Sequence, residues 1–117
     1  MLTHIYLLGI IYMGDIMNYL LVMLKKEEKR NNNMISEYLR ELDSLPRGSI
    51  KEKTVNGNKY YYLNYRDGDK VVSKYVGKDN DLIIELKEQL KRRKQIEELL
   101  KMLIKERSDI QKMEAII

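Results

Sequence analysis

The stretch "KYYYLNYRDGDK", residues 59–70, concentrates residue types that could bind nucleic acid. It holds four tyrosines within six positions, with lysine or arginine on both sides. Tyrosine rings stack on bases or sugars, and cationic side chains neutralise phosphates. A purely structural interpretation competes with this one, because tyrosine is a strong strand former and Tyr–Lys cross-strand pairs stabilise exposed sheets.

A second basic feature is the run "KRRK", residues 91–94, inside a helical pattern. Four consecutive cations cover most of a helical turn, so at least two must point outward. They either extend a basic surface or belong to a solvated helix in which Glu88, Glu97 and Glu98 are their partners one turn away.

Catalytic chemistry has few available groups in this chain. There is no cysteine, and His4 is the one histidine. Nucleophile–base pairs and histidine or cysteine metal clusters therefore cannot be assembled. We expect a protein that is not an enzyme and that uses no cofactor and no metal. The absence of cysteine fits a reducing, cytoplasmic compartment, and the net charge of +4 is only mildly basic.

Two hairpin signals organise the middle of the chain. Asn56-Gly57 and Asp67-Gly68 both accept the positive φ angles of two-residue turns, and they separate β-branched and aromatic runs. They predict a three-stranded antiparallel β-meander over residues 49–77. Two-residue turns pair Ile50 with Leu63, and Leu63 with Val72. A three-residue loop over residues 67–69 would change the facing of the third strand.

This register divides the sheet into two faces. One face is predicted to lie under a helix, and it holds Ile50, Thr54, Tyr61, Leu63, Tyr65, Val72 and Val76. The other face mixes aromatic rings, cations and small polar groups, and it holds Lys51, Lys53, Tyr60, Tyr62, Asn64, Arg66, Ser73 and Tyr75.

Helical patterns flank the predicted sheet. Residues 34–45 predict a short helix that ends before Pro46, and residues 80–115 predict a long amphipathic helix capped by Asp79 or Asn80. Its apolar stripe contains Leu82, Leu86, Leu90, Ile96, Leu100, Leu103 and Ile110. We expect part of this helix to cover the sheet and the rest to pair with another helix, in the same chain or in a second protomer.

The first 24 residues are almost wholly apolar, and residues 25–33 read as a charged, Asn-rich linker before a small α+β domain over 34–117. Three interpretations of residues 1–24 are open. They are a membrane anchor, a buried or oligomer-forming helix, or an extension from an upstream start codon, since Met13, Met17, Met23 and Met34 offer later starts.

Residues 45–101 resemble an uncharacterised family of small bacterial and archaeal proteins. The shared pattern is a Leu-Pro-x-Gly-Ser start (45–49), a Tyr-rich strand (60–65), a Lys-Tyr-hydrophobic-Gly-Lys end (74–78) and an Arg-containing helix. Residues 1–33 lie outside the resemblance, which implies no activity.

More loosely, the three strands resemble the arm-type DNA-binding sheet of phage integrases and the N-terminal part of some transposases. That resemblance implies DNA contacts by Lys51, Lys53, Tyr60, Tyr62, Arg66 and Lys74. The recombinase catalytic domain that normally follows is not in this chain.

These observations predict an α+β fold with an N-terminal apolar helix, a short helix, a β-meander and a long C-terminal helix. The expected function is that of a non-enzymatic accessory protein of phage or mobile-element type, binding nucleic acid or a nucleoprotein complex. The candidate contacts are Lys51, Lys53, Tyr60, Tyr62, Arg66, Lys74, Tyr75, Arg92 and Arg93. One alternative is an anti-CRISPR-like inhibitor that binds a nucleic-acid-guided defence nuclease. Another is a structural protein that residues 1–24 tether to a membrane or that forms homo-oligomers through its long helix.

Overall fold

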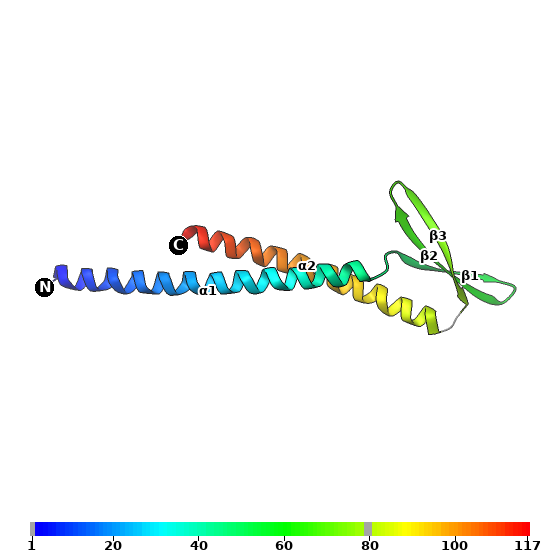
Figure 1. Cartoon of the computed structure of the whole chain (residues 1–117), viewed down its shortest axis with the longest axis horizontal. Coiled ribbons are helices and arrows are strands. Elements are labelled where there is room, and N and C mark those ends of the chain that lie inside the picture. Colours follow the sequence, from blue (N-terminus) through cyan, green and yellow to red (C-terminus); the bar gives the residue numbers. More distant parts are fainter. Residues whose placement is uncertain (1, 79–80) are drawn as a thin grey trace. The chain divides into compact units, whose positions relative to one another are not determined.

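The computed structural model describes residues 2–78 and 81–117. The element order is α1 (Leu2–Ser44), β1 (Ser49–Val55), β2 (Asn58–Asp67), β3 (Lys70–Lys78) and α2 (Asp81–Ile116) (Figure 1). The three strands form an antiparallel meander in the order β1-β2-β3, so the predicted α+β fold is confirmed. The predicted cap at Asp79 or Asn80 and the side chain of His4 lie outside the described part of the chain.

The chain divides into two compact units. We call Met1–Glu37 with Leu100–Ile117 the helical unit, and Tyr38–Leu99 the sheet unit. Both helices contribute to both units.

The predicted linker at residues 25–33 is wrong, because α1 continues through it without a break. Arg30 pairs with Glu27 one turn away at 3.0 Å, which favours a helix locally. Asn31 is a poor helix former, but here it is fully buried and its Nδ2 donates to the carbonyl oxygen of Leu103 at 2.8 Å. A contact between distant segments thus holds the Asn-rich stretch in a helix.

In the helical unit, α1 and the C-terminal part of α2 form an antiparallel helix pair, which we call the hairpin although the sheet separates the two helices in the sequence (Figure 1). Asn31 contacts Leu103, and Lys25, earlier in α1, pairs with Glu114, later in α2, at 3.1 Å. The two helices therefore run in opposite directions. Four apolar side chains form the core of this hairpin: Ile35, Leu100, Leu103 and Ile110.

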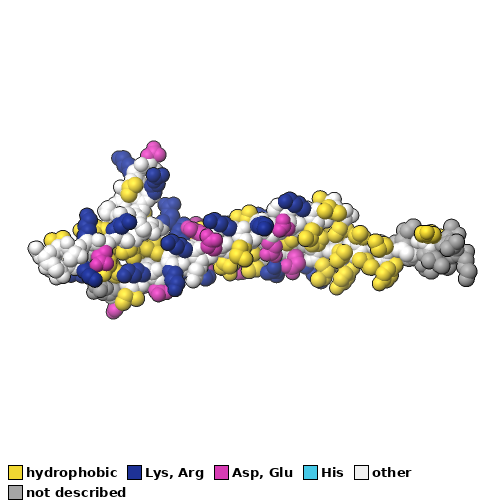
Figure 2. Space-filling view, turned by 180° about the vertical axis from the view of Figure 1, so that it is seen from behind, with side chains coloured by type: hydrophobic (Ala, Val, Ile, Leu, Met, Phe, Trp, Pro, Cys, Tyr) yellow, Lys and Arg dark blue, Asp and Glu magenta, His cyan; other side chains and the backbone are white. Residues whose placement is uncertain are grey.

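Helix α1 extends past the end of α2 toward its own N-terminus. Ile116, at the end of α2, meets Leu20 and Leu24 in an apolar hollow of about 280 Å³. We call residues 6–23 the apolar segment, and Figure 2 shows apolar side chains in a band along this hairpin. Its exposed large apolar residues are Tyr6, Leu7, Tyr12, Met13, Ile16, Met17, Tyr19, Leu20, Val22 and Met23. Within the described residues, neither helix is long and apolar enough to cross a membrane.

The first hairpin of the sheet unit confirms the predicted register. Asn56 and Gly57 have φ angles of 53° and 80°, as a type I′ turn requires, and Ile50 pairs with Leu63.

The second turn lies one residue later than predicted. Asp67 pairs with Lys70, so Gly68 and Asp69 form the turn, and Leu63 faces Lys74 instead of Val72. Gly68 has a φ of 63°, and a glycine at the first central position is what a type II′ turn requires. A shift of two residues in the pairing keeps most side chains on their predicted faces, because the side-chain period of a strand is two.

An irregularity at Tyr61 and Tyr62 alters the end of β3. Tyr61 pairs with Gly77 and Tyr62 with Tyr75, which leaves Val76 as an additional residue in β3. The bulge sets Lys78 opposite Tyr60, whereas Tyr75 stands opposite Tyr62 in the regular pairing. Val76 lines a hollow with Ile83 and Leu86 of α2, so it lies on the helix-covered side of the sheet, as predicted.

The core of the sheet unit contains Tyr61, Leu63, Ile83 and Ile96. Leu82 is exposed and its neighbour Ile83 is buried, so the predicted apolar stripe is out of phase at the start of α2. Gly48 joins α1 to β1 with a φ of 119°, where a Cβ atom would overlap a backbone oxygen of β2.

Candidate nucleic-acid interface

The tyrosine face is the sheet face opposite the buried Tyr61 and Leu63. The strand register places Lys51 beside Tyr62, Lys53 beside Tyr60, and Tyr75 beside Tyr62. Directly paired residues share a face, so these side chains stand together as predicted. We define the tyrosine face by its aromatic and cationic members: Lys51, Lys53, Tyr60, Tyr62, Arg66, Tyr75 and Lys78.

Three tyrosine rings on this face form one cluster. The ring centre of Tyr75 lies 5.4 Å from that of Tyr62 and 6.4 Å from that of Tyr60, with the rings tilted in both pairs. Tyr75 remains 52% exposed. Contact between the rings restricts their rotation, which lowers the entropy cost of binding a flat ligand.

Lysine ammonium groups lie over two of the rings. Lys53 Nζ is 4.8 Å from the centre of the Tyr62 ring, and Lys78 Nζ is 5.4 Å from that of Tyr60. Lys78 is absent from the sequence-predicted contacts because the bulge in β3, which sets it beside Tyr60, carries no clear sequence signal.

The carboxylates of the described strands are confined to one face of the sheet, whereas lysines occur on both faces. Within the described strands, no residue of the tyrosine face is Asp or Glu, while Glu52 and Asp67 pair with residues of the other face. Lys51, Lys53, Arg66 and Lys78 therefore have no carboxylate beside them on their own face, where the local charge is positive.

Lys74 does not belong to this face. It pairs with Leu63, whose side chain is buried on the opposite face, so the predicted contact by Lys74 is separated from the tyrosine cluster by the sheet.

The two candidate arginines of α2 are engaged inside the sheet unit. Arg92 makes two hydrogen bonds to the carboxylate of Glu41, at 2.8 and 3.0 Å, and these hold the pKa of Glu41 below its ordinary value. Arg93 Nη1 donates to the carbonyl oxygens of Leu42 and Leu45, at 3.0 and 3.1 Å. Arg93 thereby caps the end of α1, where carbonyl groups lack helical partners. Both arginines hold α1 against α2, and neither belongs to the tyrosine face.

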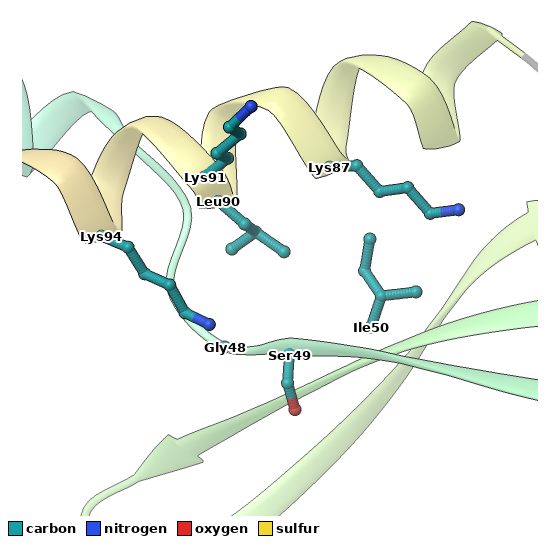
Figure 3. Close-up of a pocket in the computed structure, with 7 residues that line it drawn as sticks. All are labelled: Gly48, Ser49, Ile50, Lys87, Leu90, Lys91 and Lys94. Atoms are coloured by element: carbon teal, nitrogen blue, oxygen red, sulfur yellow. The ribbon is translucent and has the colours of Figure 1, made fainter.

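Three lysines of α2 surround a hollow beside the start of β1. The hollow measures about 350 Å³, and Leu90 and Ile50 point into it (Figure 3). Lys87, Lys91 and Lys94 recur at helical spacing around it, and the Lys94 side chain extends toward Gly48 (Figure 3). Lys87 Nζ also lies 5.2 Å from the centre of the Tyr61 ring. The spacing of these lysines was visible in the sequence, but the strand that faces them was not.

Residues 24–92 match the family described as Domain of unknown function (DUF6788). This is more than half of the chain, and it covers the resemblance from residue 45 to residue 92. Residues 24–33 lie outside the resemblance that the sequence pattern suggested, but they are inside the matched family region. Helix α1 crosses this stretch without a break. No curated protein and no solved structure matches the chain significantly.

Proposed function

The chain belongs to the DUF6788 family, and we propose that it binds nucleic acid, without catalysis, through the tyrosine face. The observation that carries this proposal is the confinement of the strand carboxylates to the face opposite the tyrosines. Aromatic rings and cations share one face without a carboxylate, and the acidic strand residues pair on the other. The opposite face carries lysines as well as carboxylates, and Lys59 pairs there with Glu52 at 3.5 Å, so only the tyrosine face keeps its cations without a carboxylate neighbour on the strands.

The preferred ligand of the tyrosine face is single-stranded nucleic acid. The Tyr60–Tyr62–Tyr75 cluster offers exposed ring surface on which unpaired bases can stack, and each stacked base contributes about 1–3 kcal/mol. Lys51 pairs directly with Tyr62, and Arg66 lies on the same face opposite Val71, four residues further along β2 than Tyr62, so the two cations are placed to neutralise phosphates beside and beyond the stacked bases.

We extend the proposal to a positioning role, in which the protein docks on nucleic acid and another protein performs the chemistry, as the loose sequence resemblance to the arm-type sheet of integrases would imply. We therefore retain an accessory protein of phage or mobile-element type as the proposed class. Lys91 and Lys94 have no ion-pair partner within the described residues, so the hollow beside β1 can take further phosphates of a longer strand.

One observation favours a protein partner as the second candidate. Leu82 and Ile84, at the start of α2, are 65% and 58% exposed, and large apolar side chains at such a position suit a protein interface. An inhibitor of a nucleic-acid-guided nuclease would use this surface together with the basic one.

The test is fluorescence anisotropy with labelled 12-nucleotide single strands and the corresponding duplexes, of both DNA and RNA, at several salt concentrations. We expect single strands to bind more tightly than duplexes. Tyr62→Ala should weaken binding about 5- to 150-fold, since a stacked base contributes about 1–3 kcal/mol. Tyr62→Phe should retain most of the affinity, because the ring remains.

Two lysine variants provide a matched control, since each removes one charge from the same sheet. Lys53→Gln, on the tyrosine face, should lower the slope of log affinity against log salt by about 0.7. Lys74→Gln, on the opposite face, should leave the slope unchanged. Equal effects of the two substitutions, or no binding at low salt, would refute the proposal. Capture of a protein that free nucleic acid does not displace would favour the inhibitor.

A further inference from the structure

We propose that the apolar segment of α1, residues 6–23, is a self-association surface that pairs with the same segment of a second copy of this chain. This inference goes beyond the proposed function and does not depend on it. It rests on exposed apolar area, on the spacing of side chains along α1, and on the point at which α2 ends.

The apolar segment exposes much apolar area, about half of it near one face of the helix. Ten large apolar side chains between residues 6 and 23 are between 37% and 72% exposed. At about 100 Å² each, they expose on the order of 1,000 Å² around the helix, and roughly half of this belongs to side chains within a quarter turn of one face: Tyr6, Met13, Ile16, Met17 and Leu20. Monomers rarely leave an apolar patch of that size open, and a standard interface buries about 800 Å² per partner.

The apolar side chains continue the seam that α2 occupies. In the hairpin, α2 packs on the α1 face that includes Asn31 and Ile35. Leu24, Leu20, Met17 and Met13 precede them along α1 in alternating steps of four and three residues, which is the spacing of a helix–helix seam. Because α2 ends beside Leu20 and Leu24, the seam beyond that point has no helix of the described chain on it.

The polar residues of the segment leave this seam open. Asp15 and Asn18 are three residues apart and fall on the opposite side of the helix from Met13 and Met17. The segment carries no lysine or arginine before Lys25, so it lacks the cations that attract a helix to an anionic lipid surface. A helix from a second copy has the matching seam and is present at the same concentration, and two-fold dimers are the commonest assemblies.

The experiment measures the mass of the full chain by sedimentation equilibrium in detergent-free buffer. We expect the mass of two chains, where one chain has a mass of 14.0 kDa. Met13→Glu would place two carboxylates in the interface of a two-fold dimer and should raise the dissociation constant about 100-fold or more. Leu39→Glu is the matched control, since Leu39 is on the same helix with 49% exposure against 55% for Met13, and it should leave the mass unchanged.

Circular dichroism of both variants shows whether α1 remains helical. A second variant, Met17→Glu, tests the seam independently if Met13→Glu loses helix. A wild-type chain that is monomeric at every concentration overturns the inference. Equal weakening by the Met13 and Leu39 substitutions also overturns it, as does binding to phosphatidylcholine vesicles in place of self-association. Loss of nucleic-acid binding does not affect this readout, so the two proposals fail separately.

Discussion

Replacing Arg93 with methionine should destabilise the sheet unit and leave its binding surface intact. The side chain is 17% exposed, and its Nη1 makes two hydrogen bonds to carbonyl oxygens at the end of α1. Methionine keeps a similar length and helix propensity but has no donor, so the substitution isolates the loss of the cap.

The expected cost follows from the contacts that are lost. A hydrogen bond to a charged group contributes about 1.5–3 kcal/mol. The Leu42 carbonyl keeps a second donor, the backbone nitrogen of Leu45 at 3.2 Å, so its loss costs less than the full value. The ion pair with Glu97 is exposed and adds about 0.3–0.5 kcal/mol. We expect about 2–3 kcal/mol in total, which lowers Tm by about 8–24 °C in a unit of this size.

The assay is urea unfolding followed by circular dichroism, with nucleic-acid affinity measured on the folded variant. Lys94→Met is the matched control, because Lys94 is the next residue, is exposed, and should cost less than about 0.5 kcal/mol. A cost for Arg93→Met no larger than that of the control would refute the capping role. Weaker nucleic-acid binding by the fully folded Arg93→Met variant would indicate that Arg93 contacts nucleic acid.

Three further predictions concern pH, backbone geometry and the hollow. In the helical unit, a hydrogen bond to Glu114 raises the pKa of Glu28. The protonated Glu28 therefore stabilises the fold at low pH, and this contribution is lost as the pH rises through the raised pKa. Glu28→Gln keeps the donor and cannot ionise, so its stability relative to wild type should increase with pH in urea titrations between pH 4 and 8, and a constant difference would contradict this. Gly48→Ala forces a side chain into a positive-φ position against β2 and should cost about 2 kcal/mol or more in the same assay, whereas wild-type stability would show that the link is not strained. Lys91→Gln with Lys94→Gln should lower the salt slope by about 1.4 for 30-nucleotide single strands and leave it unchanged for 12-nucleotide strands. An equal change of the salt slope for both lengths would show that the hollow does not bind the additional phosphates of the longer strand.

The sheet was the most predictable part of this protein. Asn56-Gly57 defines a two-residue turn by local backbone energetics alone, so the pairing of Ile50 with Leu63 followed from the sequence. Alternation along the strands then places Tyr60, Tyr62 and Arg66 on one face, whatever the tertiary contacts are. These features depend on neighbours a few residues apart, which a sequence displays directly.

Tertiary contacts decided the remaining features. Residues 25–33 look like a linker by composition, yet they are helical because Asn31 is buried against Leu103. Arg92 and Arg93 look like surface cations, yet they bind the end of α1 in the fold.

By itself, the sequence determined the three strands, the first turn and the mixed chemistry of the tyrosine face, since short-range backbone preferences and strand alternation are local. Only the tertiary structure decided which cations remain available for a ligand, because that depends on which distant carbonyls and carboxylates the fold brings to each of them. Lys53 and Lys78 stand over tyrosine rings, while Arg93 is held by two backbone carbonyl groups. The same kind of charge therefore serves the proposed binding surface in one place and the stability of the fold in the other.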